Sequence, residues 1–179
     1  MKYIATLTDQ DVFQKIEFEK PESFQKRTTV KAIVMNDSRM FGFVTNSIHG
    51  FYLLAGGGAE SENLNEEIIR ECEEEINFEV EVIKKIGEIH EYRNREVREY
   101  ETVCFLVKTL SKSPGDTRTE DERKNGMDVV WLDKDEAIKK LHEQVEKVKN
   151  GDIGFYNTAF NIIRDNLFFE EYLAQENIR

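Results

Sequence analysis

The sequence is poor in the residues that interrupt or cross-link a chain. Its 179 residues include only two prolines, two cysteines and three histidines, and no segment is of low complexity. The scarcity of proline and the lack of low-complexity segments argue against a long disordered region. Hydrophobic residues make up 39% of the chain, which suffices for one domain with a sizeable core but not for two full-sized domains.

Long apolar runs are also missing. No run approaches the length that spans a membrane, and the start MKYIATLTDQD lacks the apolar segment and cleavage site of a secretory signal. One disulfide is arithmetically possible, but nothing indicates secretion. We therefore expect a soluble, cytoplasmic protein in which Cys72 and Cys104, both within apolar patterns, are reduced and buried.

Positive charge is in deficit, because 25 Lys and Arg face 36 Asp and Glu and give a formal net charge of −11. Such a chain repels a polyanion, so general DNA or RNA binding is disfavoured. A small phosphate substrate is still compatible, since bound divalent cations can invert the local potential.

Hydrophobic periodicity and turn residues predict a mixed domain. We expect an N-terminal strand arm at 1–27, for packing or dimerisation, with Tyr3, Ile4, Val12, Phe13, Ile16 and Phe18 in one or two short strands. A single domain at 28–179 follows, with strands at 28–35, 40–45, 51–54, 80–86, 100–107 and 129–132, and a polar stretch at 88–99 spanning another strand and its bend. Helices are expected over 66–76, from Asp133 to about 148, and over 156–173. The mixture predicts an α/β or α+β fold with helices covering a sheet.

The first of these helices carries three acids in a pattern that points to metal chemistry. Glu71, Glu74 and Glu75 lie at i, i+3 and i+4 and share one helical face. Crowded carboxylates repel one another, and Arg70 alone cannot neutralise three of them. Mg²⁺ and Mn²⁺ choose oxygen ligands, so the face suits such an ion. The alternative is a solvated acidic face, which is our interpretation of Glu66, Glu67 and Glu73.

Three glycines precede this helix at an informative spacing. Gly56-Gly57-Gly58 follows an apolar strand, and glycine lets the backbone turn sharply and approach a ligand closely. From Gly56 the chain reads five residues, Glu62, seven residues, and then Arg70-Glu71-Cys72-Glu73-Glu74-Glu75-Ile76-Asn77-Phe78. This resembles the Nudix signature G-x5-E-x7-R-E-U-x-E-E-x-G-U, where U is a bulky apolar residue. Asn77 replaces a glycine and is the next-best residue for a left-handed turn. The small but apolar Cys72 fills an aliphatic position, and Ala55 stands where many members have proline.

The resemblance, from about residue 28 to 142, implies a Nudix-type α/β/α sandwich and a metal-dependent hydrolase. Its substrate would be a nucleoside diphosphate linked to another moiety, of the nucleoside triphosphate, nucleotide sugar or ADP-ribose type. It implies Glu71, Glu74, Glu75 and the Gly56 carbonyl as ligands of Mg²⁺ or Mn²⁺, with Glu62 and Arg70 orienting the cluster. The candidates for the general base are Glu75, Glu120 and Glu122.

Substrate contacts beyond the diphosphate are less specific. Tyr92, Arg93, Arg95 and Arg98 could hold a base and phosphates by stacking and charge pairing. The alternative is that they are exposed strand residues paired with Glu96, Glu99 and Glu101. The aromatic residues at 155–172 are interpreted as core or as the seam of a homodimer.

Three other functions compete with hydrolysis. A non-catalytic ligand-sensing module on the same fold often lacks acids that this chain keeps. A Nudix-fold isomerase of isoprenoid diphosphates needs a catalytic cysteine, whereas Cys72 and Cys104 lie in apolar patterns. A plain acidic interaction domain leaves the glycine-to-acid spacing unexplained.

Overall fold

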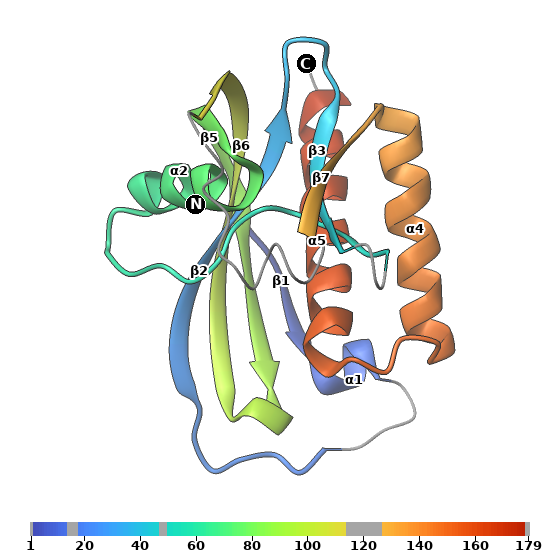
Figure 1. The fold of residues 1–179 in the computed structure, drawn as a ribbon. Helices are drawn as coiled ribbons and strands as arrows, with labels where there is room; N and C mark the ends of the chain where they lie inside the picture. Colours follow the sequence, from blue (N-terminus) through green and yellow to red (C-terminus); the bar gives the residue numbers. More distant parts are fainter. Residues whose placement is uncertain (1, 14–17, 47–49, 114–126, 178–179) are drawn as a thin grey trace.

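The computed structural model describes residues 2–13, 18–46, 50–113 and 127–177, and its centre is a seven-stranded mixed sheet (Figure 1). The strand order is β1-β5-β6-β2-β3-β4, with β7 paired to β3. The strands are β1 (Tyr3–Thr8), β2 (Gln25–Met35), β3 (Phe41–Asn46), β4 (Tyr52–Leu53), β5 (Phe78–Arg93), β6 (Arg98–Lys112) and β7 (Met127–Leu132). The helices are α1 (Asp9–Val12), α2 (Leu64–Ile76), η1 (Asn94–Glu96), α4 (Lys134–Asn150) and α5 (Tyr156–Asn177).

Helices cover both faces of the sheet, as the predicted sandwich requires. Helix α2 packs on β2 and β5 from one side, while α5 packs on β1, β4 and β5 from the other and carries α4 on its flank (Figure 1). The side chains of β2 alternate between the two faces of the sheet, so this strand contributes to the core on each side, as its central place requires. Val30, Ala32 and Val34 belong to the core under α2, whereas Ile33 belongs to the core under α5.

The N-terminal arm is partly a strand and partly a helical turn. Strand β1 pairs in parallel with β5 and so joins the central sheet. The prediction that Val12 belongs to a second short strand was wrong, because residues 9–12 form α1 instead. The Asp11 carboxylate accepts hydrogen bonds from the backbone nitrogen and the hydroxyl of Thr8, at 2.8 and 2.7 Å, and this cap favours a helical turn. Ile16 lies outside the described residues.

Strands β5 and β6 are longer than periodicity predicts. The polar stretch after residue 86 continues β5 to Arg93, because β1 and β6 pair with it on both sides. The bend falls at η1 and at Val97, whose φ is 57°. Tertiary pairing therefore overrides the polar composition of this segment.

The cysteines and most C-terminal aromatic residues belong to the interior. Cys72 and Cys104 are free thiols with no exposed surface, and burial raises the pKa of both. Tyr156, Phe160, Phe168, Phe169 and Tyr172 are buried in the core under α5, while Phe155 is exposed. Among the described helices, none is long and apolar enough to cross a bilayer.

Candidate active site

The three predicted acids lie on α2 beside the glycine turn. The helix buries Ile68, Cys72 and Ile76 against the sheet, and this places the carboxylates of Glu71, Glu74 and Glu75 on its other faces. It ends at Asn77, whose φ of 59° and ψ of 39° are left-handed, so Asn77 takes the conformation expected for the glycine it replaces.

The glycine turn is fastened directly to the acidic helix. The backbone nitrogen of Gly56 donates a 2.7 Å hydrogen bond to Oε2 of Glu75. Gly56 has φ of +125°, and a Cβ there would collide with the Val30 carbonyl of β2. A Cβ on Gly57 would lie 2.6 Å from the Glu71 carboxylate. Gly56 is therefore required by its backbone conformation and by its close approach to β2, while a side chain at position 57 would displace the Glu71 carboxylate.

Arg70 ties the carboxylates of the helix together. Its guanidinium donates to Glu67 at 2.8 Å, to Glu71 at 2.7 Å and to Glu74 at 2.8 Å. These bonds raise the pKa of Arg70, and the bond from Arg70 lowers the pKa of Glu67 to about 2. Desolvation raises the pKa of the buried Glu71, against the opposing effect of Arg70.

Two acids occupy other positions than the sequence indicated. Glu67, interpreted as a solvated acid, is buried and paired with Arg70. Glu62, expected to orient the cluster, is exposed and is not among the hydrogen-bond partners of Arg70 within the described part of the chain. The i, i+3 spacing of Glu67 and Arg70 was the available signal for this pair. Glu120 and Glu122 lie outside the described residues.

Lys31 is a further site residue that the sequence analysis missed. Its ammonium donates a 3.0 Å hydrogen bond to the Leu54 carbonyl and another to the carbonyl of Gly56, the proposed metal ligand. A single lysine within the apolar strand segment 30–34 was the signal that could have revealed it. Lys31 adds positive charge beside the acidic helix and is half-buried.

A cavity of about 250 Å³ adjoins the glycine turn. Its lining comes from β2, the turn, the β5–β6 pair and α5, namely Arg27, Thr29, Lys31, Gly56, Gly57, Gly58, Arg93, Tyr100, Asn157, Asn161 and Arg164. The α5 residues were missed, although the spacing of Asn157, Asn161 and Arg164 places three polar side chains on one helical face.

Arg93 is the one predicted substrate residue that lines this cavity. It is 4% exposed and donates to Glu91 at 2.8 Å, to Asn157 at 3.2 Å and to Asn161 at 2.9 Å. Its guanidinium also lies over the ring of Tyr100, 4.5 Å from the centroid. Arg93 is therefore not an exposed strand residue, which corrects that alternative for this position.

A buried ionic network connects Arg93 to the glycine turn. Arg164 donates to Glu91 at 3.3 Å and to Asp165 at 2.8 and 2.9 Å, and Asp165 accepts from the Leu54 backbone nitrogen at 2.9 Å. Burial opposes ionisation of Glu91, but Arg164 and Arg93 hold its pKa below the usual range. The network fixes α5 and β5 relative to the turn.

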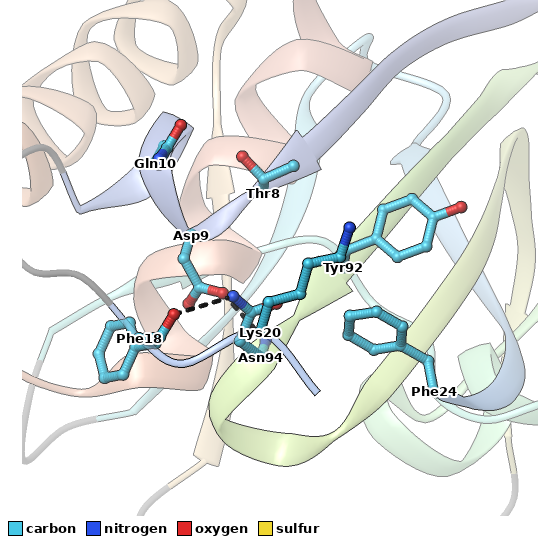
Figure 2. Close-up of a pocket in the computed structure, with 8 residues that line it drawn as sticks. All are labelled: Thr8, Asp9, Gln10, Phe18, Lys20, Phe24, Tyr92 and Asn94. Atoms are coloured by element: carbon cyan, nitrogen blue, oxygen red, sulfur yellow. Dashed lines mark hydrogen bonds between the residues drawn. The ribbon is translucent and has the colours of Figure 1, made fainter. Parts of the chain in front are cut away.

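The other three predicted substrate residues lie elsewhere. Tyr92 points to the opposite face of β5, where it lines a separate cavity of about 640 Å³ together with Phe24 (Figure 2). The centroids of the two rings are 5.3 Å apart. Its hydroxyl donates to Glu99 at 3.5 Å, as the exposed-strand alternative proposed. Arg95 is exposed with its guanidinium 5.6 Å from the Tyr156 ring, and Arg98 is half-buried outside the cavity at the turn.

The acidic helix fits a divalent metal ion. Glu71, Glu74 and Glu75 offer only oxygen donors, as Mg²⁺ and Mn²⁺ prefer. Arg70 neutralises part of their charge, and its guanidinium is held by the carboxylates of Glu67, Glu71 and Glu74. Its Nε is buried and has no hydrogen-bond partner among the described residues.

Comparisons with known proteins agree with this architecture. A family model described as the NUDIX domain matches residues 25–150. The MutT protein from Methanosarcina mazei Go1 is similar in structure, with a TM-score of 0.54, 17% identity, and coverage of 91% of this chain and all (100%) of that chain. A NUDIX hydrolase from Nitrosomonas europaea gives a TM-score of 0.53 and 20% identity, covering 65% of this chain and 78% of its own. A sequence search of curated proteins finds no match. The chain therefore belongs to the Nudix family.

Proposed function

We propose that the protein hydrolyses a phosphoanhydride bond in a nucleoside diphosphate linked to another moiety, with Mg²⁺ or Mn²⁺ held by Glu71, Glu74 and Glu75. The observation that carries this proposal is the bond from the Gly56 nitrogen to Glu75, which holds the glycine turn against the acidic face. The bound metal would supply an activated water and would neutralise charge on the phosphate oxygens.

The residues of this chain would then have separate tasks. Arg70 orients Glu71 and Glu74 by its two terminal nitrogens. Lys31 holds the Gly56 carbonyl by a hydrogen bond and contributes positive charge beside the acidic helix. Glu75 is the general-base candidate within the described residues. Its Oε2 is held by Gly56, so its carboxylate has a fixed orientation.

The cavity beside the turn would take the acceptor-rich part of the substrate. Arg27 and Lys31 are cations at its wall, and the amide nitrogen of Asn161 has no hydrogen-bond partner among the described residues. The Nε of Arg93 is also buried, with no hydrogen-bond partner in the described part of the chain. These groups are all donors, so they suit phosphate, sugar or carbonyl oxygens of the substrate.

A substrate panel tests the proposal. The protein is incubated with Mg²⁺ or Mn²⁺ and with nucleoside triphosphates, nucleotide sugars, ADP-ribose and dinucleoside polyphosphates, and the released products are measured. We expect metal-dependent release of a nucleoside monophosphate from at least one class and its loss in Glu74→Gln. Binding of these compounds without turnover would contradict hydrolysis and favour a ligand-sensing module instead.

A further inference from the structure

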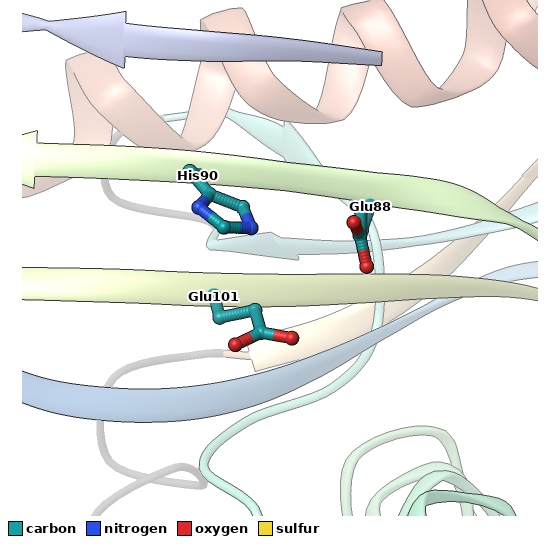
Figure 3. A group of neighbouring side chains, drawn as sticks. All are labelled: Glu88, His90 and Glu101. Atoms are coloured by element: carbon teal, nitrogen blue, oxygen red, sulfur yellow. The ribbon is translucent and has the colours of Figure 1, made fainter. Parts of the chain in front are cut away.

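A second group of potential metal ligands lies on the sheet, outside the segment 56–78 that carries the Nudix signature and is called the box below. Glu88 and His90 are two residues apart on β5, and Glu101 is the cross-strand partner of His90 on β6. Alternation along β5 directs these side chains away from Glu91 and Arg93, which line or support the substrate cavity on the other face. Figure 3 shows the three side chains gathered over the β5–β6 pair.

The geometry brings one ligand atom from each side chain into a common space. These atoms lie within 4.8 Å of one another. Donors around a tetrahedral ion at 2.0–2.2 Å are about 3.4 Å apart, so a small rotation of the exposed Glu101 would close the set. The ring of Tyr3 on β1 lies edge-on to His90 at 5.8 Å between centroids and restricts the imidazole from one side.

The charge of this group is uncompensated in the described part of the chain. No side-chain hydrogen bond or ion pair among the described residues involves Glu88, His90 or Glu101. The carboxylates of Glu71 and Glu91, by contrast, have cationic partners. Glu71 has Arg70, and Glu91 has Arg93 and Arg164. A bound cation would supply the missing positive charge at this position.

We propose that Glu88, His90 and Glu101 bind a divalent transition-metal ion of the Zn²⁺ class, with water completing its coordination. An imidazole with two carboxylates suits Zn²⁺ or Co²⁺, whereas the oxygen-only box suits Mg²⁺. The two sites therefore differ in the ion they select. The ion would bridge β5 to β6 behind Arg93 and Tyr100 and so stiffen the strand pair that carries them.

Cobalt provides a direct spectroscopic test. The chelator-treated protein of residues 1–179 is titrated with Co²⁺ in the presence of excess Mg²⁺, which saturates the box, and visible absorption and bound cobalt are measured. We expect one Co²⁺ per chain with the absorption of a nitrogen-containing site. Zn²⁺ should displace it and should raise the thermal unfolding midpoint of the metal-free protein.

Four variants locate the site. His90→Ala and Glu101→Gln should each lose the cobalt absorption and weaken binding by at least about 10-fold, since each removes one of three ligands. Two control variants, His142→Ala, which changes another histidine, and Glu74→Gln in the box, should retain both the cobalt absorption and the affinity for cobalt. If His90→Ala does not fold, the loss of cobalt binding in Glu101→Gln tests the site by itself. Absence of bound cobalt in the parent, or cobalt absorption that survives both ligand variants, would overturn the proposal.

Discussion

The backbone nitrogen of Gly56 and the carboxylate of Glu75, 19 residues apart, are joined by a 2.7 Å hydrogen bond. The bond requires a glycine, because φ at this position is +125° and a side chain would meet the Val30 carbonyl. Substitution Gly56→Ala should therefore displace the turn, lower the free energy of unfolding by on the order of 2 kcal/mol and abolish most hydrolysis. Urea denaturation and product release measure the two effects.

Gly154→Ala is the matched control for this prediction. A Cβ at Gly154 meets no atom within 4 Å, so the variant should keep both stability and activity. Equal behaviour of Gly56→Ala and Gly154→Ala would contradict the account of the turn.

The pair of Glu67 and Arg70 predicts a specific dependence of stability on pH. The folded pKa of Glu67 is about 2, below its ordinary value of 4.5, so ionised Glu67 stabilises the fold above pH 4.5. That contribution is lost as pH falls from about 4.5 toward 2. The free-energy difference between the parent and Glu67→Gln should thus be constant near neutrality and shrink in acid. Urea midpoints measured from pH 7 to pH 3 check this. Glu66→Gln, on the exposed side of α2, is the control, and a difference that is independent of pH would contradict the pairing.

The buried position of Arg93 predicts a large stability effect. Arg93→Met removes one partner of a buried network and leaves Glu91 with Arg164 as its remaining cationic partner. Breaking a buried ion pair in this way costs about 3–5 kcal/mol. Arg95→Met, two residues away and exposed, should change stability by less than about 0.5 kcal/mol. Chemical denaturation compares the two variants, and similar losses in both would show that the network is not stabilising.

The two hydrogen bonds of Lys31 at the glycine turn predict a change in catalysis when this side chain is removed. Lys31→Met removes the charged donor from the carbonyls of Leu54 and Gly56, and hydrogen bonds to charged groups contribute about 1.5–3 kcal/mol. We expect kcat/KM to fall about 10- to 100-fold. Lys26→Met, on the same strand but 82% exposed, serves as the control. A Lys31→Met variant with parental kcat/KM would contradict a role for this ammonium.

The sequence predicted the local structure of the site better than its long-range partners. The spacing from Gly56 to Glu75 identified the turn and the helix because both are continuous in the chain. The pairing of Arg93 with Asn157 and Asn161 joins residues at least 64 positions apart, and no local pattern encodes that distance. Alternation along β5 could have separated Tyr92 from Arg93, since neighbouring strand residues face opposite sides.

The comparison of Glu74→Gln with Glu73→Gln tests the central claim most directly. The two residues are adjacent on α2, and both are exposed, but only Glu74 is bound by Arg70 and belongs to the proposed metal ligands. With a substrate from the panel and saturating Mg²⁺, Glu74→Gln should lower kcat/KM by on the order of 100-fold or more, while Glu73→Gln should match the parent. Equal activity of the two variants would contradict metal-dependent hydrolysis at this helix.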